Sequence, residues 1–212
     1  MRSIIMANGV FTLPVKIKKN DFIIAANGGI ANCLELGLIP NLAIGDFDST
    51  QEEILEKLEN LGTEILKFPV RKDETDLELA VNYAVKAGYE EIVLFAALGK
   101  RWDQTIANFL LPVRYPNNKI KILDGQQEIH YIHEGKSHHI QGQPGDTLSL
   151  IPLINFVTGI TTTGLEYPLL NGVLHLGKTR GVSNRMTGKT VIVKITGGIL
   201  LCAVTHRKSL EN

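Results

Sequence analysis

Short apolar segments alternate with amphipathic segments along the first 123 residues of the chain. Most of the apolar segments are hydrophobic at nearly every position, which is typical of strands buried on both faces of a parallel sheet. They predict strands at Ser3–Ala7, Phe22–Ala26, Leu42–Ile44, Glu64–Phe68, Ile92–Ala97 and Ile120–Leu123. Alternation of such strands with helices predicts an α/β domain with a mostly parallel sheet.

Three longer helices are predicted between these strands. Thr50–Leu61 and Thr75–Lys86 each open with a threonine followed three residues later by a glutamate, the spacing of a capping box. The third helix, Asp103–Val113, carries four apolar residues on one face: Ile106, Phe109, Leu110 and Val113. Such a face is typical of a helix that packs on a sheet.

The pattern changes beyond residue 124. The rest of the chain shows no convincing helix and contains short strands rich in Ile, Val, Thr and Leu, separated by Gly-containing turns. The predicted strands are Ile129–His133, Ser137–Gln141, Thr147–Pro152, Phe156–Thr162, Leu165–Leu170, Val173–Leu176, Thr190–Ile195 and Ile199–His206. This spacing is typical of a β-sandwich or barrel. We therefore predict an α/β domain at 1–124 and a β-sandwich or barrel at 125–212.

Composition excludes several classes of protein. The chain is 44% hydrophobic and 21% charged with a net charge of +0 at pH 7, so it is too apolar for disorder and has no overall basic field for nucleic acid or a membrane surface. No apolar run approaches the ~18 residues of a membrane span, and the first residues lack the core of a signal peptide. The two cysteines, Cys33 and Cys202, have no neighbours at metal-ligand spacing. A cytoplasmic protein without disulfides or structural zinc is the expectation.

Aspartates gather where predicted strands lead into helices. They form three groups: Asp46 with Asp48, Asp73 with Asp76, and Asp103. The carboxyl ends of parallel strands are where α/β sheets bind ligands, so three loops can bring these carboxylates together. Oxygen-only ligation suits Mg²⁺, which usually accompanies a phosphate substrate. If Asp46-Phe47-Asp48 is extended, both carboxylates face one ion. The alternative is that each aspartate only caps a helix.

Glycines and basic residues lie beside the acidic groups. Gly28-Gly29 follows a predicted strand and opens a helical stretch, where backbone N–H groups can approach a phosphate. Arg71-Lys72 precedes Asp73, and Lys100-Arg101 precedes Asp103. A site that clamps a polyphosphate beside Mg²⁺ needs such pairs, although solvated surface charge is the alternative for each.

Three other sequence features resemble functional motifs but are not expected to have those functions. Gly172–Thr179 matches the P-loop pattern, but its variable positions are apolar and no helix is predicted after it, so we reject a P-loop. His130 and His133 would point to opposite faces of a strand and chelate poorly, and His138-His139 is also not expected to bind metal. Trp102 is expected in the core or in a pocket wall.

Several stretches together resemble the thiamine pyrophosphokinase family of bacterial type. In the first part they are Ala26–Asn32, Pro40 with Ile44–Ser49, Phe68-Pro69 with Lys72–Glu78, and Gly99–Gln104 with Asn108. In the second part they are Ser149–Pro152, Gly164–Tyr167 and Gly181–Asn184. The matches follow the family's order over nearly the whole chain. Gly-Asp-Phe-Asp-Ser followed by Lys-Asp-Glu-Thr-Asp is the specific pair among them.

The resemblance implies a reaction and an architecture. The family transfers the diphosphoryl group of ATP to thiamine with Mg²⁺, giving thiamine diphosphate and AMP. A Rossmann-like α/β domain would bind ATP, a β-sandwich would bind thiamine, and a homodimer would share its sites between subunits. The implied catalytic residues are Asp46, Asp48, Asp73, Asp76 and Asp103, of which Asp46, Asp48 and Asp73 would hold the metal. The implied ATP-binding residues are Asn27, Gly28, Lys72, Gly99 and Arg101, and the implied thiamine-binding residues are Ser183 and Asn184.

The chain departs from the family's pattern at several positions. Asn27 stands where the family usually has Asp, Gln104 stands where many members have His, and Trp102 replaces a smaller residue. No aromatic residue that would stack on thiamine is identified near Asn184. Two rival functions remain open from the residues: a diphosphokinase for another hydroxymethyl acceptor such as a pterin, and a non-catalytic nucleotide-binding sensor.

Overall fold

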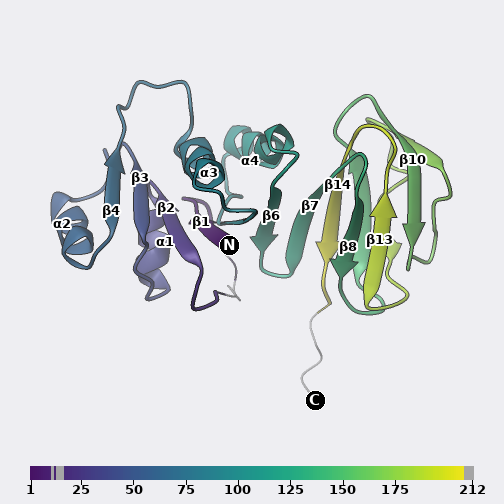
Figure 1. Ribbon diagram of the computed structural model, residues 1–212, viewed down its shortest axis with the longest axis horizontal. Coiled ribbons are helices and arrows are strands. Elements are labelled where there is room, and N and C mark those ends of the chain that lie inside the picture. Colours follow the sequence, from purple (N-terminus) through teal and green to yellow (C-terminus); the bar gives the residue numbers. More distant parts are fainter. Residues whose placement is uncertain (11, 13–16, 208–212) are drawn as a thin grey trace, which may run out of the picture. The chain divides into compact units, whose positions relative to one another are not determined.

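The computed structural model describes residues 1–10, 12 and 17–207 of the chain (Figure 1). Contacts between residues divide it into two units, Met1–Gly125 (unit 1) and Gln126–Asn212 (unit 2). Each unit has its own apolar core, so each is described separately.

Unit 1 is built on a parallel sheet with helices. Its strands are β1 (Arg2–Met6), β2 (Phe22–Ala26), β3 (Leu42–Gly45), β4 (Glu64–Lys67), β5 (Glu91–Phe95) and β6 (Lys119–Asp124). Within unit 1 their order is β6-β5-β1-β2-β3-β4, and every neighbouring pair is parallel. All six predicted strands of the α/β part are therefore present in the described residues, with ends that differ by a few residues.

Apolar runs place the strands of unit 1 in the interior. Ile4 and Ile5 are both 0% exposed although successive residues of a strand face opposite sides, so β1 is covered on both faces. The helices are α1 (Gly29–Glu35), α2 (Glu52–Asn60), α3 (Asp76–Lys86) and α4 (Trp102–Leu110), with a 3₁₀ turn η1 (Leu111–Arg114) after the last. Both α1 and α3 pack on β1 and β2.

Helix starts were predicted with mixed success. The Thr75 hydroxyl accepts a hydrogen bond from the Glu78 N–H at 3.2 Å, so the predicted cap of α3 is confirmed. The predicted Thr50 cap is wrong, because α2 begins at Glu52 and its N-cap position is Gln51, whose side chain makes no capping bond. The Thr50 N–H instead bonds the Phe47 carbonyl in the turn that follows β3.

Helix α4 does not bury the face that its sequence predicts. Ile106 and Leu110 are 55% and 48% exposed, whereas Thr105 is the buried residue of the helix. Trp102, at 79% exposure, is neither in the core nor in the pocket wall, so that prediction is wrong. The helix packs through Thr105, whose hydroxyl bonds Gly99, and through the Asn108 amide, which donates to the Ala97 carbonyl at 2.6 Å. These polar anchors, rather than the apolar positions, set which side of α4 faces inward.

Unit 2 consists of two antiparallel sheets, β12-β9-β14-β7 and β11-β10-β13-β8. The strands are β7 (Gln127–His133), β8 (Ser137–Gln141), β9 (Thr147–Pro152), β10 (Phe156–Thr163), β11 (Gly172–His175), β12 (Asn184–Arg185), β13 (Thr190–Lys194) and β14 (Ile199–Thr205). One core joins them, with Leu148 and Val204 from one sheet and Ile160 and Val191 from the other. The antiparallel part is therefore a two-sheet sandwich.

Two strand assignments in unit 2 need correction. Leu165–Leu170 does not form the predicted strand, since only Leu165 makes an isolated bridge, to Met186. Pro168 has no N–H to donate, and the Leu169 N–H bonds the Thr162 hydroxyl instead of a ladder carbonyl. The short strand β12 was not predicted because two residues carry no periodic signal.

The P-loop look-alike lies in this sandwich. Its first residues form β11, and a turn in which the Lys178 N–H bonds the His175 carbonyl follows, so the helix that a P-loop requires is absent from this described segment. No helix among residues 1–10, 12 and 17–207 is both long and apolar enough to cross a membrane.

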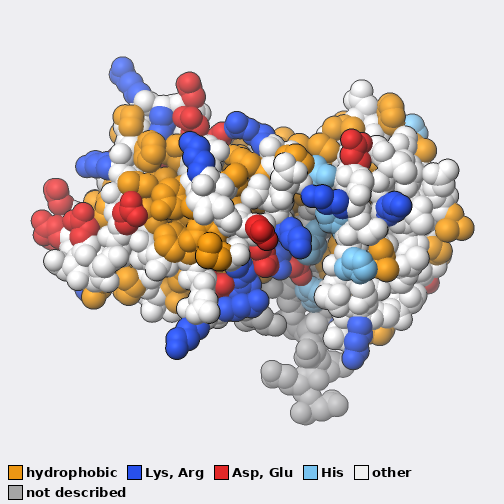
Figure 2. Space-filling model, in the orientation of Figure 1, with side chains coloured by type: hydrophobic (Ala, Val, Ile, Leu, Met, Phe, Trp, Pro, Cys, Tyr) orange, Lys and Arg blue, Asp and Glu red, His pale blue; other side chains and the backbone are white. Residues whose placement is uncertain are grey.

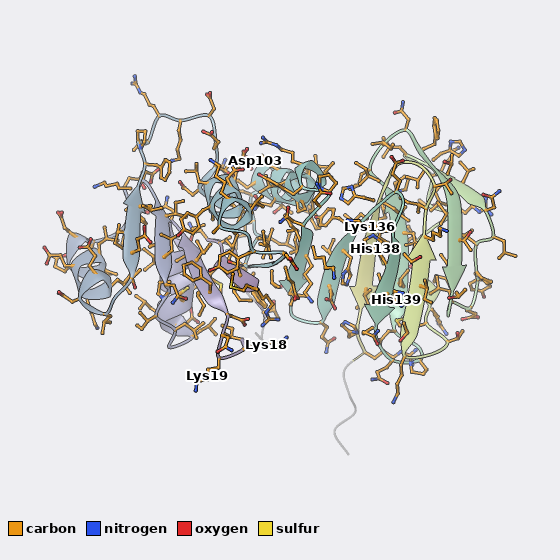
Figure 3. The ribbon with its side chains drawn as sticks, in the orientation of Figure 1. Lys18, Lys19, Asp103, Lys136, His138 and His139 are labelled. Atoms are coloured by element: carbon orange, nitrogen blue, oxygen red, sulfur yellow. The ribbon has the colours of Figure 1, made fainter. Side chains whose placement is uncertain are left out.

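The surface carries mixed charge. On the face that Figure 2 shows, basic and acidic side chains are interspersed, and acidic side chains gather over α2, whose sequence contains four glutamates. Figure 3 shows His138 and His139 adjacent on β8, and on a strand such neighbours face opposite sides. Among the described residues, no group of three His, Cys, Asp or Glu side chains is arranged to hold a metal ion.

Candidate active site

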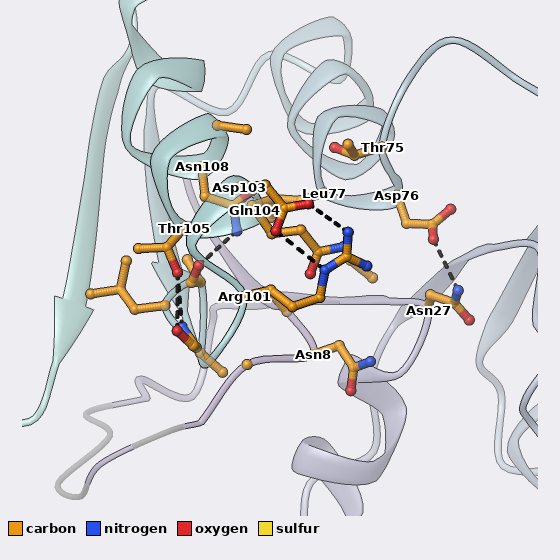
Figure 4. A pocket seen from close by; sticks show the side chains of 18 of the residues that line it. Asn8, Asn27, Thr75, Asp76, Leu77, Arg101, Asp103, Gln104, Thr105 and Asn108 are labelled. Carbon is orange, nitrogen blue, oxygen red and sulfur yellow. Dashed lines mark hydrogen bonds and ion pairs between the residues drawn. The ribbon is translucent and has the colours of Figure 1, made fainter.

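A pocket opens at the carboxyl end of the parallel sheet of unit 1. The sheet order reverses between β1 and β5, and the crevice at such a point is where open α/β sheets bind ligands. The cavity has a volume of about 740 Å³ (Figure 4). Its polar lining comes from four loops and from the helices α3 and α4: Asn8, Asn27, Lys72, Glu74, Thr75, Asp76, Lys100, Arg101, Asp103, Gln104, Thr105 and Asn108.

Close packing of the loops shapes the pocket. The Gly9 N–H bonds the Ala96 carbonyl at 2.7 Å, and a Cβ at position 9 would overlap that carbonyl oxygen. A Cβ at Gly28 would overlap the Asn8 side chain. These glycines are required by packing, so their presence does not depend on a phosphate ligand. Asn32 holds the same loop, since its amide donates to the Ala7 and Gly9 carbonyls at 2.8 and 3.1 Å.

Strained backbone follows three of the strands. Asn27 after β2, Phe47 after β3 and Ala96 after β5 have positive φ angles of 47°, 56° and 51°. Left-handed backbone is uncommon for residues other than glycine and costs of order 1–3 kcal/mol, and it concentrates at functional sites. At Phe47 it also breaks the extended geometry from which we inferred that Asp46 and Asp48 face one ion. That argument is wrong: Phe47 is buried, Asp48 is exposed, and the segment turns.

Four side chains from three loops form a closed polar ring. The Asn27 amide donates to Asp46 Oδ1 at 3.0 Å and to Asp76 Oδ2 at 2.9 Å. The Lys72 ammonium lies 3.2 Å from Asp46 Oδ2 and 3.0 Å from Asp76 Oδ1. Each carboxylate therefore binds the amide with one oxygen and the ammonium with the other. Figure 4 shows the Asn27–Asp76 bond at the edge of the pocket.

Electrostatics in the ring favour the charged forms. Burial opposes ionisation of Asp46, but hydrogen bonds from Lys72, from the Asp48 N–H and from Asn27 outweigh it and lower the pKa of that carboxyl. Burial likewise opposes the Lys72 charge, and the contacts with Asp76 and Asp46 outweigh it, so the pKa of Lys72 is raised. Lys72 thus forms ion pairs with both Asp46 and Asp76.

The other predicted acidic residues lie outside this ring. Asp48 and Asp73 are exposed and do not line the pocket. Asp103 lines the pocket at the start of α4, where it forms an exposed ion pair with Arg101 at 2.6 Å. The hydrogen bond from Arg101 lowers the pKa of Asp103. The structure therefore brings Asn27, Asp46, Lys72 and Asp76 together and leaves the pair Arg101–Asp103 separate.

Sequence reasoning gave no role to Asn8, Thr105 or Asn108. Thr105 Oγ1 lies 3.2 Å from both the N–H and the carbonyl of Gly99, and Asn108 holds the Ala97 carbonyl. Both fix the loop between β5 and α4 on which Gly99 and Arg101 stand. Polar residues at positions 105 and 108, one helical turn apart inside an apolar helix, were the available signal.

In unit 2 the predicted Asn184 bonds the backbone of an exposed tyrosine, and the predicted Ser183 precedes it in the chain. Ser183 has a φ of 63°, and its N–H bonds Ser149 Oγ at 3.0 Å. The Asn184 amide donates to the Tyr167 carbonyl at 2.7 Å and accepts from the Tyr167 N–H at 3.1 Å. Tyr167 itself is 67% exposed. Asn184 therefore holds the backbone of an exposed aromatic residue.

Comparison with known proteins gives matches over most of the chain. The family model described as "Thiamin pyrophosphokinase, catalytic domain" matches residues 14–123, and "Thiamin pyrophosphokinase, vitamin B1 binding domain" matches residues 129–200. A thiamine pyrophosphokinase of Bacillus subtilis (strain 168) is 30% identical over 180 residues, which cover 84% of each chain. Thiamine pyrophosphokinase 1 of Oryza sativa subsp. japonica is 32% identical over 72% of this chain and 61% of its own length.

Crystal structures of relatives share the fold. The thiamine pyrophosphokinase from Bacillus subtilis superposes with a TM-score of 0.87 at 27% identity, covering 97% of this chain and 99% of that chain. The thiamin pyrophosphokinase from Geobacillus thermodenitrificans gives 0.84 at 28% identity, covering 99% of both chains.

Proposed function

The chain belongs to the thiamin pyrophosphokinase family, whose reaction transfers the diphosphoryl group of ATP to thiamine, and we propose that the pocket of unit 1 binds ATP for this reaction. The observation that carries the proposal is the pocket at the sheet reversal, which lies in the segment matched by the catalytic-domain model. Lys72 and Arg101 line it, and both suit phosphate oxygens. Gly99 and Gly28 shape the loops beside them.

A magnesium ion fits the oxygens of the ring. Asp46 and Asp76 supply carboxylate oxygens, and Asn27 Oδ1 is buried without a hydrogen-bond partner among the described residues. Such a donor set contains only oxygen, the ligand that Mg²⁺ prefers. We propose that Asp46 and Asp76 hold the ion, which would supply charge neutralisation at the polyphosphate. Asp48 and Asp73 remain predicted ligands that contribute no carboxylate contact to the ring in the described residues.

The reaction requires positioning more than covalent chemistry by the protein. The thiamine hydroxyl oxygen forms a bond to the β-phosphorus while the bond from that phosphorus to the oxygen bridging the α-phosphate breaks, so AMP leaves. Lys72, Arg101 and the loop held by Thr105 orient the triphosphate for in-line displacement. Asp103 keeps Arg101 in the pocket through their ion pair. A carboxylate of the site receives the hydroxyl proton.

We propose that unit 2 contributes the thiamine contact through Tyr167. Tyr167 is exposed, and the Asn184 side chain holds its backbone N–H and carbonyl. Aromatic rings offer a flat apolar face to a heteroaromatic ligand. Asn184 would then act by placing Tyr167 rather than by offering free polar groups.

Product analysis tests the function. Purified protein is incubated with ATP, Mg²⁺ and thiamine, and nucleotides are separated by ion-exchange chromatography. AMP and thiamine diphosphate in equal amounts are expected. ADP as the stoichiometric product contradicts the assignment. A parallel reaction with a hydroxymethylpterin tests the rival acceptor, and ATP binding without AMP formation with either acceptor favours the sensor.

We further propose a homodimer with active sites shared between subunits. The ATP-site residues all precede residue 104 and the thiamine-site residues lie in unit 2, while α4 exposes Trp102, Ile106 and Leu110 at a helical spacing that suits contact with another surface. Mixing Asp46→Asn with Tyr167→Ala protein tests sharing. Shared sites predict that activity at low thiamine rises as subunits exchange, because one site of each heterodimer carries neither substitution. No rise after demonstrated exchange contradicts sharing.

We keep the proposal of a cytoplasmic location, in which cysteines remain as free thiols. Cys33 and Cys202 are both free and buried, and burial raises the pKa of the Cys33 thiol to about 12.

A further inference from the structure

Lys72 pairs with two carboxylates of its own chain, unlike an ordinary surface lysine. Its ammonium lies 3.2 Å from Asp46 Oδ2, 3.0 Å from Asp76 Oδ1 and 3.2 Å from the Pro69 carbonyl oxygen. The Asp46 and Pro69 oxygens accept hydrogen bonds from the ammonium, and Asp76 Oδ1 is its ion-pair partner. The side chain is only 10% exposed. A lysine that binds only incoming phosphate would keep donors free.

Asn27 completes the ring as its neutral member. Its two amide hydrogens go to the remaining oxygens of the same carboxylates, Asp46 Oδ1 and Asp76 Oδ2. Three of the four carboxylate oxygens therefore accept a hydrogen bond from within the chain, and the fourth, Asp76 Oδ1, has only the ion-pair contact with Lys72. An aspartate at position 27 would have no hydrogen to donate and would add a third negative charge. Because the Asn27 amide is neutral, the ring holds two carboxylates and one ammonium, and its net charge is about −1.

Asn27 and Lys72, the two hydrogen-bond donors of the ring, differ in how freely they can move. Asn27 stands on left-handed backbone with φ of 47°, and a Cβ at Gly45 would come within 2.9 Å of the Asn27 Cβ, so this residue is packed in place. Lys72 stands in the loop between β4 (Glu64–Lys67) and α3 (Asp76–Lys86) at the end of a four-carbon side chain. Lys72 is therefore the member of the ring that can leave.

We propose that Lys72 is an internal counter-cation that competes with a divalent metal ion for the Asp46–Asp76 pair, and that it is released to the polyphosphate when nucleotide binds. The proposal rests on the proposed function of the pocket, which Lys72 also lines. Nucleotide phosphates offer the ammonium new acceptors, and its departure frees one oxygen of each carboxylate. The free protein then binds a divalent ion weakly, and metal enters together with nucleotide.

Manganese binding in the absence of nucleotide tests the competition. Free Mn²⁺ is measured by electron paramagnetic resonance during titration of the full-length protein. Lys72→Gln removes the charge and is expected to bind Mn²⁺ at least about tenfold more tightly than the wild type. Lys72→Arg keeps the positive charge, and this variant is expected to bind Mn²⁺ as weakly as the wild type. Lys100→Gln is the matched control, because Lys100 lines the same pocket and is exposed; its affinity should change by less than about threefold.

A double variant locates the ion. Asp46→Asn added to Lys72→Gln is expected to abolish the gain in Mn²⁺ affinity, since it removes one carboxylate of the pair. Equal affinities of Lys72→Gln and the wild type overturn the proposal, as does a gain that survives Asp46→Asn. Tight binding by Lys72→Arg also overturns it. Circular dichroism checks folding, and Lys72→Met replaces Lys72→Gln if that variant is unfolded.

The proposed function can fail separately. Mn²⁺ titration uses neither ATP nor thiamine, whereas the function is judged by AMP and thiamine diphosphate from the wild-type protein. Wild-type AMP formation with unchanged Mn²⁺ affinity in Lys72→Gln rejects only the counter-cation. Absence of AMP formation with the expected Mn²⁺ pattern rejects only the function.

Discussion

Replacing Asn184 by alanine separates the two substrates of the proposed reaction. The substitution removes the two hydrogen bonds that fix the Tyr167 backbone, at 2.7 and 3.1 Å, and touches no residue of the ATP pocket. We expect the KM for thiamine to rise while the KM for ATP stays within about twofold of the wild type. The reason is that Tyr167 loses its fixed position.

The size of the effect follows from the two bonds. A hydrogen bond between neutral groups contributes about 0.5–1.5 kcal/mol, and the lower half of this range applies because solvent reaches both bonds. Their sum is about 1–2 kcal/mol. Since ~1.4 kcal/mol corresponds to a factor of ten, the thiamine KM should rise about 5- to 30-fold.

The assay measures AMP formation while thiamine and ATP are varied separately. Tyr167→Phe keeps the ring and should retain a near wild-type thiamine KM, whereas Tyr167→Ala should raise it at least as much as Asn184→Ala. Asn155→Ala is the control, because Asn155 is an exposed asparagine of the same unit whose side chain makes no recorded bond in the described structure. In the Tyr167→Ala background, Asn184→Ala should add less than about twofold, since both changes remove one contact.

Three results refute the reasoning. An unchanged thiamine KM in Asn184→Ala shows that Tyr167 needs no support or binds no thiamine. Full additivity of Asn184→Ala and Tyr167→Ala shows that Asn184 acts independently of the tyrosine. A rise in the ATP KM alone places Asn184 in the other substrate's site.

Three further predictions concern charge and the pocket. Asp46→Asn should lower kcat by about 10²-fold or more at saturating Mg²⁺ with the fold intact by circular dichroism. Near wild-type turnover would mean that Asp46 only holds Asn27 and Lys72 in place. Lys178→Ala should leave the KM for ATP within about twofold of the wild type, since Lys178 lies in a turn of unit 2. A hundredfold rise in that KM would show that the segment does act as a P-loop. Burial raises the pKa of Asp146, but the N–H groups of Arg207 and Gln143 and the His206 ring outweigh it, so the folded pKa is lowered. The stability that the Asp146 carboxylate contributes is therefore present above its unfolded pKa of about 3.9 and is lost as the pH falls through its lower folded pKa. Between about pH 5 and pH 3, the free energy of unfolding measured in urea should fall less in Asp146→Asn than in the wild type. Equal falls in the two proteins would contradict this.

Local patterns determined most elements of the chain. Runs of branched apolar residues specify buried strands because no other local arrangement hides both faces, and every strand predicted for unit 1 is found. The Thr75 cap was predictable because its partner, Glu78, is three residues away. The same rule failed at Thr50, because the turn after β3 takes that residue and the helix starts later. The strand predicted at Leu165–Leu170 is wrong because this segment makes one isolated bridge and only scattered further bonds, including those between Leu169 and Thr162, rather than a continuous ladder.

The sequence predicted the chemical type of the candidate site, and the tertiary structure decided which residues meet there. Acidic and basic residues at strand ends indicated a phosphate and metal site, since strand ends of a parallel sheet share one edge. Which of them meet depends on strand order and loop conformation, which bring Asn27 to Asp76 across 49 positions of sequence. Left-handed backbone at Phe47 turns Asp48 away from the extended geometry that alternation assumed. Pairing of side chains from distant loops is set by the energy of the whole fold, so the Asn27–Asp46–Lys72–Asp76 ring and the support of Tyr167 by Asn184 had no local signal to reveal them.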